Sequence, residues 1–191
     1  MDKIISILLM TIYTITFSQV KIGKSDVAAL SSTSVLLEFG DTKDKGIILP
    51  YVETVPAESS LQATGGTLIF DISANTEYKI KVKNQNAGWT DLSIQSGYTT
   101  AAESTVKNPQ ASPLVDLAGA KIIIGSASST ADGVLVLESS NKAMVLPIVD
   151  DYKAIKNPSP GMLAFLKGLI ADEHRLIVFN GQKWTFWRPK K

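Results

Sequence analysis

The sequence contains one phrase twice, as "KGIILPYVET" at residues 45–54 and as "KAMVLPIVDD" at residues 142–151. Each copy runs through a lysine, a small residue, three apolar residues ending in leucine, a proline, one further residue, a valine and an acid. Proline has no N–H to donate to a β-ladder, so each phrase predicts a strand that stops pairing at Leu-Pro. Its recurrence predicts a duplicated β unit.

Other landmarks recur in the same order around the two phrases. They are "KIG" (21–23) with "IIIG" (122–125), "VLLEF" (35–39) with "VLVLES" (134–139), "GTLIFD" (66–71) with "GMLAFL" (161–166), and Phe70 and Trp89 with Phe165 and Trp184. Matched landmarks in one order indicate a tandem duplication, roughly 20–93 and 113–188.

We therefore expect a first repeat unit at 19–93, a linker at 94–112 and a second repeat unit at 113–191. The linker is expected because "SGYTTAAESTVKNPQAS" (96–112) is small, polar and contains proline. A β unit of this size buries little core by itself. The units are thus expected to form an elongated object or to be completed by oligomerisation.

The fold class predicted from both units is all-β and rich in hairpins. "YKIKVK" (78–83) alternates apolar residues with lysines, which is typical of a strand with one wet face. Its counterpart "RLIVF" (175–179) is followed by Asn180-Gly181, a hairpin signal, and then by "QKWTFW". Further strands are predicted at 35–39, 47–49, 67–71, 121–124, 134–138, 143–146 and 162–166. One helical turn is expected in each of the Pro-broken stretches 52–65 and 149–161.

The N-terminus predicts export. Lys3 precedes the uncharged apolar run "IISILLMTIYTITF" (4–17), which ends at small residues around Ser18. This run is too short to span a bilayer, which takes about 20 residues, and is typical of a secretory signal peptide. We expect residues 1–18 to be removed, leaving Gln19 first, no membrane span and a secreted or cell-surface protein. An N-terminal anchor or a core helix is the alternative.

Composition excludes several classes of partner and site. With 19 Lys+Arg against 18 Asp+Glu, the chain has no electrostatic field to attract nucleic acid. It contains no cysteine, which excludes disulfides, thiolate metal sites and an N-terminal lipoprotein anchor.

The order of the motifs resembles a repeat of exported surface proteins and tail-fibre-like proteins of Bacteroidetes-type bacteria. The second unit carries the pattern best, through Lys142, Leu146, Pro147, Asn157, Pro158, Gly161, Phe165, Phe179, Asn180, Gly181 and Trp184. The first unit keeps Gly23, Lys45, Gly46, Leu49, Pro50, Gly66, Phe70, Asp71 and Trp89 but has "NQNAG" in place of Asn-Gly. The chain departs from the family in reading "VKIGKS" where a Gly-rich run is usual. The resemblance implies a surface or structural module without catalytic residues.

No residue pattern predicts catalysis, a cofactor or a metal site. His174 is the only histidine, so paired-histidine metal sites are excluded, and a solvated turn is its expected place. The acid pairs Asp150-Asp151, Asp172-Glu173 and Asp41/Asp44 could serve as glycosidase carboxylates, but acids in turns usually face water. "GDTKDKG" (40–46) lacks the spacing and the terminal Glu of an EF-hand.

The aromatic C-terminal strand supplies the candidate contact residues. Trp184 and Phe186 alternate with Trp187, so one face of the strand must point outward. Trp89 and Trp184 are expected to be equivalent core residues. We expect Trp187, with Arg188 and Phe186, to contact a partner subunit or a sugar.

These observations leave three classes of function. The first is a non-enzymatic exported structural protein of the cell surface or of an extracellular assembly, a fibre or adhesin-like subunit that associates with itself or with other surface proteins. The second is a soluble carbohydrate- or surface-binding module. An enzyme is the third, and only scattered acids favour it.

Overall fold

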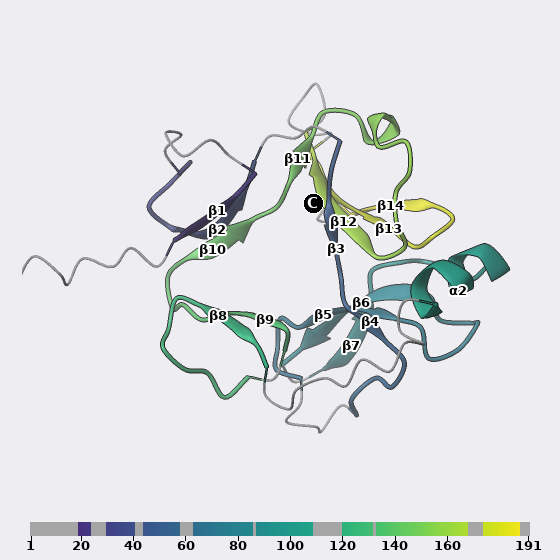
Figure 1. Ribbon diagram of the computed structural model, residues 1–191, viewed down its shortest axis with the longest axis horizontal. Helices are drawn as coiled ribbons and strands as arrows, with labels where there is room; N and C mark the ends of the chain where they lie inside the picture. Colours follow the sequence, from purple (N-terminus) through teal and green to yellow (C-terminus); the bar gives the residue numbers. More distant parts are fainter. Residues whose placement is uncertain are drawn as a thin grey trace, which may run out of the picture.

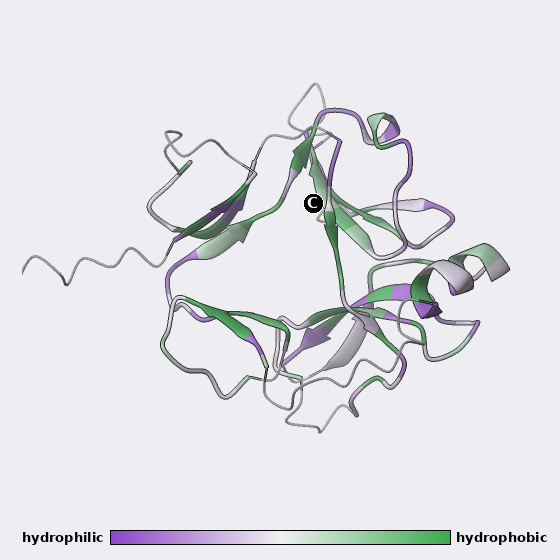
Figure 2. Ribbon diagram, viewed as in Figure 1, coloured by the Kyte–Doolittle hydropathy of each residue, from purple (hydrophilic) through white to green (hydrophobic). Residues whose placement is uncertain are grey.

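The computed structural model describes residues 19–23, 30–40, 44–57, 63–85, 87–108, 120–131, 133–167 and 174–187. Over these residues the protein is nearly all β with one α-helix, so the predicted all-β class is confirmed (Figure 1). The strands form several small sheets rather than one large sheet. Hydrophobic residues concentrate in the strands, and the connecting segments are more polar (Figure 2). The predicted signal peptide lies outside the described residues.

The two repeat units contain the same order of strands, and all but the third strand of each have the same pairings. Unit 1 has β1 (Val20–Ile22), β2 (Val35–Phe39), β3 (Ile47–Ile48), β4 (Tyr51–Val52), β5 (Leu68–Asp71), β6 (Lys79–Asn84) and β7 (Gly88–Asp91). Unit 2 has β8 (Ile122–Ile124), β9 (Leu135–Leu137), β10 (Ala143–Val145), β11 (Ile148–Val149), β12 (Met162–Leu166), β13 (Arg175–Phe179) and β14 (Trp184–Trp187). In each unit the first two strands pair in parallel, the fourth pairs in parallel with the fifth, and the last three form an antiparallel meander. The repetition predicted from the sequence is confirmed at the level of strand order and pairing.

The Leu-Pro phrase has the same structural role in both units. The strand before it ends at the residue preceding the leucine, and the proline carbonyl accepts a backbone hydrogen bond from the later strand. Phe70 N–H donates to Pro50 O at 2.9 Å, and Phe165 N–H donates to Pro147 O at 2.9 Å. Proline has no N–H to donate to a β-ladder, but its carbonyl still accepts a hydrogen bond from the later strand. The chain therefore passes from one sheet to the next at this residue.

Equivalent glycines precede β5 and β12. Gly66 has φ +91° and Gly161 has φ +79°, values that L side chains rarely adopt. Both N–H groups donate back into the following meander, from Gly66 to Lys83 O at 2.8 Å and from Gly161 to Phe179 O at 2.9 Å. The glycine in "GTLIFD" and "GMLAFL" is therefore a backbone requirement of the turn.

The two units are interlocked rather than joined end to end. β10 of unit 2 pairs in parallel with β2 of unit 1, and β3 of unit 1 pairs with β12 of unit 2 in antiparallel fashion. One strand of each unit therefore completes a sheet of the other. Sequence periodicity indicates where strands lie but does not assign their partners, which is why this interlocking was not predicted.

The segment expected to be a linker contains the α-helix. Helix α2 (Thr100–Lys107) begins after Thr99, whose side chain accepts the N–H of Ala102 at 2.9 Å. Ala102 and Val106 are buried against the β core. The described part of 94–112 is thus a packed element of the fold and not a free linker. Its two inward residues lie four apart, one helical turn, a signal too short to distinguish from a polar loop.

The larger hydrophobic core is built from both units. It joins Phe70, Ile72, Tyr78 and Ile80 of unit 1 to residues of unit 2, including Leu163 and Val178. A smaller core lies within unit 2 and contains Val149, Ile155, Met162, Ala164 and Ile177. The 3-10 turn η1 (Tyr152–Ala154) lies beside this smaller core and fulfils the single helical turn expected in 149–161.

Tyr78 offers a test of the larger core. Its side chain is fully buried, and its hydroxyl finds no hydrogen-bond partner in the described part of the chain. A buried, unpaired hydroxyl costs free energy that an apolar group of the same shape does not. We expect Tyr78→Phe to raise the free energy of unfolding by about 1 kcal/mol in urea titrations.

The matched control for Tyr78→Phe is Tyr51→Phe. The Tyr51 hydroxyl donates to Pro160 O at 3.1 Å, so its removal should lower stability by about 1 kcal/mol. Equal losses in the two variants would contradict the assignment of an unpaired hydroxyl at Tyr78.

Candidate interaction surfaces

The C-terminal strand β14 places its aromatic residues as the alternation predicts. Phe186 and Trp184 lie on one face, where their rings meet the Tyr152 ring edge-on at centroid distances of 5.0 and 6.2 Å. Trp184 also packs against Phe179 at 5.2 Å and is half-buried beside the smaller core. Trp184 is thus a partly buried packing residue, as is its unit 1 counterpart Trp89.

Trp187 is exposed but anchored. It retains 37% of its surface in solvent and Phe186 retains 39%. The Trp187 indole N–H donates to the Leu92 carbonyl of unit 1, a bond that ties β14 to the residue after β7. Arg188, the third predicted contact residue, lies outside the described residues. The structure therefore leaves Phe186 and Trp187 partly exposed on opposite faces of β14, and the indole N–H of Trp187 is already engaged.

A second apolar surface was not singled out from the sequence. It comprises Ile122, Val134 and Leu135, which are 63%, 66% and 46% exposed and lie on or beside β8 and β9. We call these three residues the β8–β9 patch. The equivalent strands β1 and β2 pair with a third strand, β10, whereas β8 and β9 have no third strand among the described residues. The sequence carries no local signal for the patch, because it does not assign strand partners.

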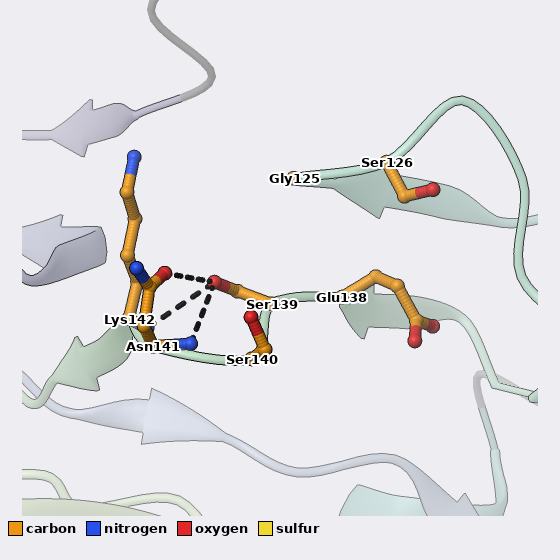
Figure 3. Close-up of a pocket in the computed structure, with 7 residues that line it drawn as sticks. All are labelled: Gly125, Ser126, Glu138, Ser139, Ser140, Asn141 and Lys142. Atoms are coloured by element: carbon orange, nitrogen blue, oxygen red, sulfur yellow. Dashed lines mark hydrogen bonds between the residues drawn. The ribbon is translucent and has the colours of Figure 1, made fainter.

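A polar hollow of about 430 Å³ opens between the end of β8 and the β9–β10 turn (Figure 3). Its polar groups are largely used within the fold. The Ser139 hydroxyl accepts the N–H groups of Asn141 and Lys142 at 3.4 and 3.2 Å, and the Glu138 carboxylate accepts a hydrogen bond from Ser129. The hollow is thus a turn with satisfied polar groups rather than a prepared ligand site.

Asp71, Lys81 and Glu77 form a charge cluster on and beside β5 and β6. The Lys81 ammonium lies 2.7 Å from both Asp71 and Glu77 carboxylates, and Asp71 is 1% exposed. Burial by itself would raise the pKa of Asp71, but hydrogen bonds from Lys81 and Ser73 outweigh it and hold that pKa below its usual range. Burial opposes the charge on Lys81 as well, yet its two carboxylate partners raise the pKa of Lys81.

The other titratable residues weighed for chemistry are dispersed. His174 lies edge-on to Phe165 at 6.1 Å, and Asp151 caps η1 by accepting the Lys153 N–H at 2.9 Å. Asp41, Asp172 and Glu173 lie outside the described residues. Within the described ranges no group of three or more histidine, aspartate or glutamate side chains could hold a metal ion.

Comparison with family models, with curated proteins and with solved structures finds no match to this chain. The resemblance to Bacteroidetes-type surface and tail-fibre-like repeats therefore stays a prediction from its motifs. In the part of the chain that the structure describes, no helix is both long and apolar enough to cross a membrane.

Proposed function

We propose that the protein is an exported, non-enzymatic structural subunit that associates with itself at the cell surface or in an extracellular assembly. The observation that carries the proposal is the duplicated β architecture, in which one strand of each unit completes a sheet of the other unit. A fold that repeats by exchanging strands between units extends readily to further units. The role as a fibre or adhesin-like subunit and the export rest on the apolar N-terminus and on the motif resemblance.

Exposed apolar side chains support self-association. Large apolar residues are exposed at Ile22, Ile48, Ile94, Ile122, Val134, Leu135, Phe186 and Trp187. Several lie on short strands at sheet edges, where unpaired backbone groups favour pairing with another chain. The formal net charge of +1 does little to keep copies apart.

A carbohydrate- or surface-binding module is the second candidate. The exposed Trp187 favours it, because an aromatic face can stack on a sugar ring, and Phe186 offers a second exposed ring on the other face of β14. Against it, the Trp187 N–H is engaged by Leu92 and the Phe186 ring already contacts Tyr152.

One experiment separates the two candidates. The full chain is expressed in a Gram-negative host, and the exported protein is purified, sequenced from its N-terminus and analysed by sedimentation velocity and electron microscopy. We expect a mature terminus at Gln19 and oligomers or filaments at micromolar concentration. A monomer at high micromolar concentration would contradict self-assembly and favour the binding module, and a retained Met1 would contradict export.

A further inference from the structure

The two Leu-Pro strands, β3 and β10, are equivalent, and each pairs with the other unit. β10 lies in parallel beside β2, whereas β3 lies antiparallel beside β12. Leu49 aligns with Leu146 at the end of the phrase, so Ile47 corresponds to Met144 and Ile48 to Val145. Equivalent strands of the two units thus have different kinds of partner in one molecule.

The two pairings use opposite edges of this strand. Leu49 N–H donates to Gly161 O at 3.2 Å, and because backbone groups alternate along a strand, Ile47 and Leu49 bond toward β12 while Ile48 bonds away from it. In β10 the Ala143 N–H donates to Ser34 O at 2.8 Å, so Val145, the equivalent of Ile48, bonds toward β2. A strand of this type can therefore hold a β2-like strand on one edge and a β12-like strand on the other.

The β2-like strand of unit 2 is β9, and its outer edge is open among the described residues. Gly40 N–H donates to Ile22 O at 2.7 Å and Glu138 N–H to Ile124 O at 2.8 Å, so β2 and β9 use the same edge for β1 and β8. The opposite edge of β2, at Leu37, receives β10. The opposite edge of β9, at Leu135, receives no strand from the described part of the chain, and Leu135 is 46% exposed where the equivalent Leu37 is 0% exposed.

We propose that β3 of a second copy of this chain pairs in parallel with the open edge of β9. This inference rests on the proposed self-association and names its contact. The register of β10 on β2 sets Met144 beside Leu37 and Val145 beside Glu38, which by equivalence sets Ile47 beside Leu135 and Ile48 beside Val136. Ile48 is 50% exposed and would cover part of the β8–β9 patch.

We assign a second copy of this chain to the open edge of β9 because the chain itself carries a strand, β3, that fits this edge. Among the described residues, each molecule has one unpaired β3 edge at Ile48 and one unpaired β9 edge at Leu135. Both are short and apolar, and their counterparts already bind each other within the chain through β10 and β2. The contact therefore repeats an interface that this sequence makes once internally.

The reciprocal contact has a partner as well. Leu163 of β12 pairs with Ile47. The equivalent residue of unit 1 is Leu68 of β5, and on the β4 side its backbone edge has no partner strand among the described residues. β10 of the first copy would pair there through Met144. Ala143 of β10 is equivalent to Gly46, the residue before β3. A Cβ added at Gly46 would lie 2.7 Å from Leu163 O. Because Ala143 has a Cβ, β10 must lie slightly farther from β5 than β3 lies from β12.

Such a contact joins different surfaces of the two copies. Head-to-tail contacts form a closed ring when the rotation between copies closes and an open filament when it does not. In either case a molecule with only one functional edge terminates the assembly, because no further copy can bind to it. The test relies on this property.

The test uses one variant for each edge. Proline at 135 removes an N–H that points away from β8, because Val134 O accepts from Ile122 and Glu138 donates to Ile124 on the β8 side. Proline at 48 likewise removes an N–H that points away from β12. We expect Leu135→Pro and Ile48→Pro each to abolish oligomers in sedimentation velocity. A mixture of the two should form a dimer, since each supplies the edge that the other lacks.

Controls separate a lost edge from a lost fold. Circular dichroism spectra and thermal midpoints should match wild type, and Leu135→Lys and Ile48→Lys should repeat the result if a proline variant unfolds. Ile94→Lys, which removes an 86% exposed apolar residue that belongs to neither β3 nor β9, should leave oligomers unchanged. Variants that assemble as wild type does would overturn the edge contact and leave the proposed function intact. A monomeric wild type would overturn both.

Disulfide trapping checks the register. The chain contains no cysteine, so Ile47→Cys in one copy and Leu135→Cys in another supply the only thiols of a mixture. Neighbouring strands lie about 4.8 Å apart, within reach of a disulfide. We expect a covalent heterodimer on oxidation, and Ile94→Cys mixed with Leu135→Cys should give none. Equal yields from the two mixtures would overturn the register.

Discussion

Phe70→Ala is expected to lower the free energy of unfolding by about 3–5 kcal/mol, the usual cost of truncating a buried phenylalanine. Phe70 is 0% exposed and contacts the rings of Tyr51 and Tyr78 edge-on at 5.7 and 6.1 Å. It also packs against unit 2, since a Cβ added to Gly161 would lie 3.1 Å from Phe70. The cavity would therefore open at the junction of the two units. Because the larger core contains residues of both, urea unfolding should remain a single transition.

The duplication supplies the matched control, Phe165→Ala. Phe165 occupies the equivalent position, with the same backbone bond to a proline carbonyl, but its ring is only partly buried and lies against His174. We expect a loss of about 1–2 kcal/mol, because much of the removed surface already faces water. A larger loss for Phe165→Ala than for Phe70→Ala would contradict a core shared across the units. Tryptophan fluorescence and far-UV circular dichroism would report both variants.

The strands that were predicted from the sequence each carried a local signal. "YKIKVK" alternates, the Leu-Pro phrases end in a residue without an N–H, and Asn180-Gly181 follows an apolar run; each of these lies in or beside an observed strand. The strands that were missed, β1, β4, β7 and β11, are mostly two or three residues long in the structure and carry too few residues to show a period. Short strands are held by their partners rather than by their own pattern.

The pairing partners of the strands could not be predicted from the sequence, and the candidate interaction surfaces depend on which strands pair. Trp187 was correctly set on the face opposite Trp184 by alternation alone, but its bond to Leu92 joins residues far apart in the sequence. The β8–β9 patch was missed for the same reason. Nothing local distinguishes Leu135 from Leu37, yet Leu37 is buried where β10 pairs with β2, and Leu135 is exposed on β9, which has no such partner among the described residues.

The charge cluster on β5 and β6 leads to the second large effect. Lys81→Ile should lower the free energy of unfolding by about 3–5 kcal/mol, because Asp71 would remain buried without its ammonium partner. Asp71→Leu should cost less, since Lys81 would still contact Glu77 at 2.7 Å. The pKa of Asp71 is held below its usual range, so its contribution to stability is present at neutral pH and is lost as the pH falls through that depressed pKa. The stability of Asp71→Leu should accordingly vary less than that of wild type below about pH 4.

Unit 2 indicates how the loss can be reversed. The residues equivalent to Asp71 and Lys81 are Leu166 and Ile177, and Ile177 is fully buried in the smaller core. The same backbone therefore accepts an apolar pair where unit 1 has an ion pair. The double variant Asp71→Leu/Lys81→Ile should recover most of the stability lost in Lys81→Ile, because replacing both charges leaves neither one unpaired. A double variant that loses the sum of the two single losses would show that Glu77 and Asp91, which also lie near Lys81 at 2.7 and 3.7 Å, need the ammonium as much as Asp71 does.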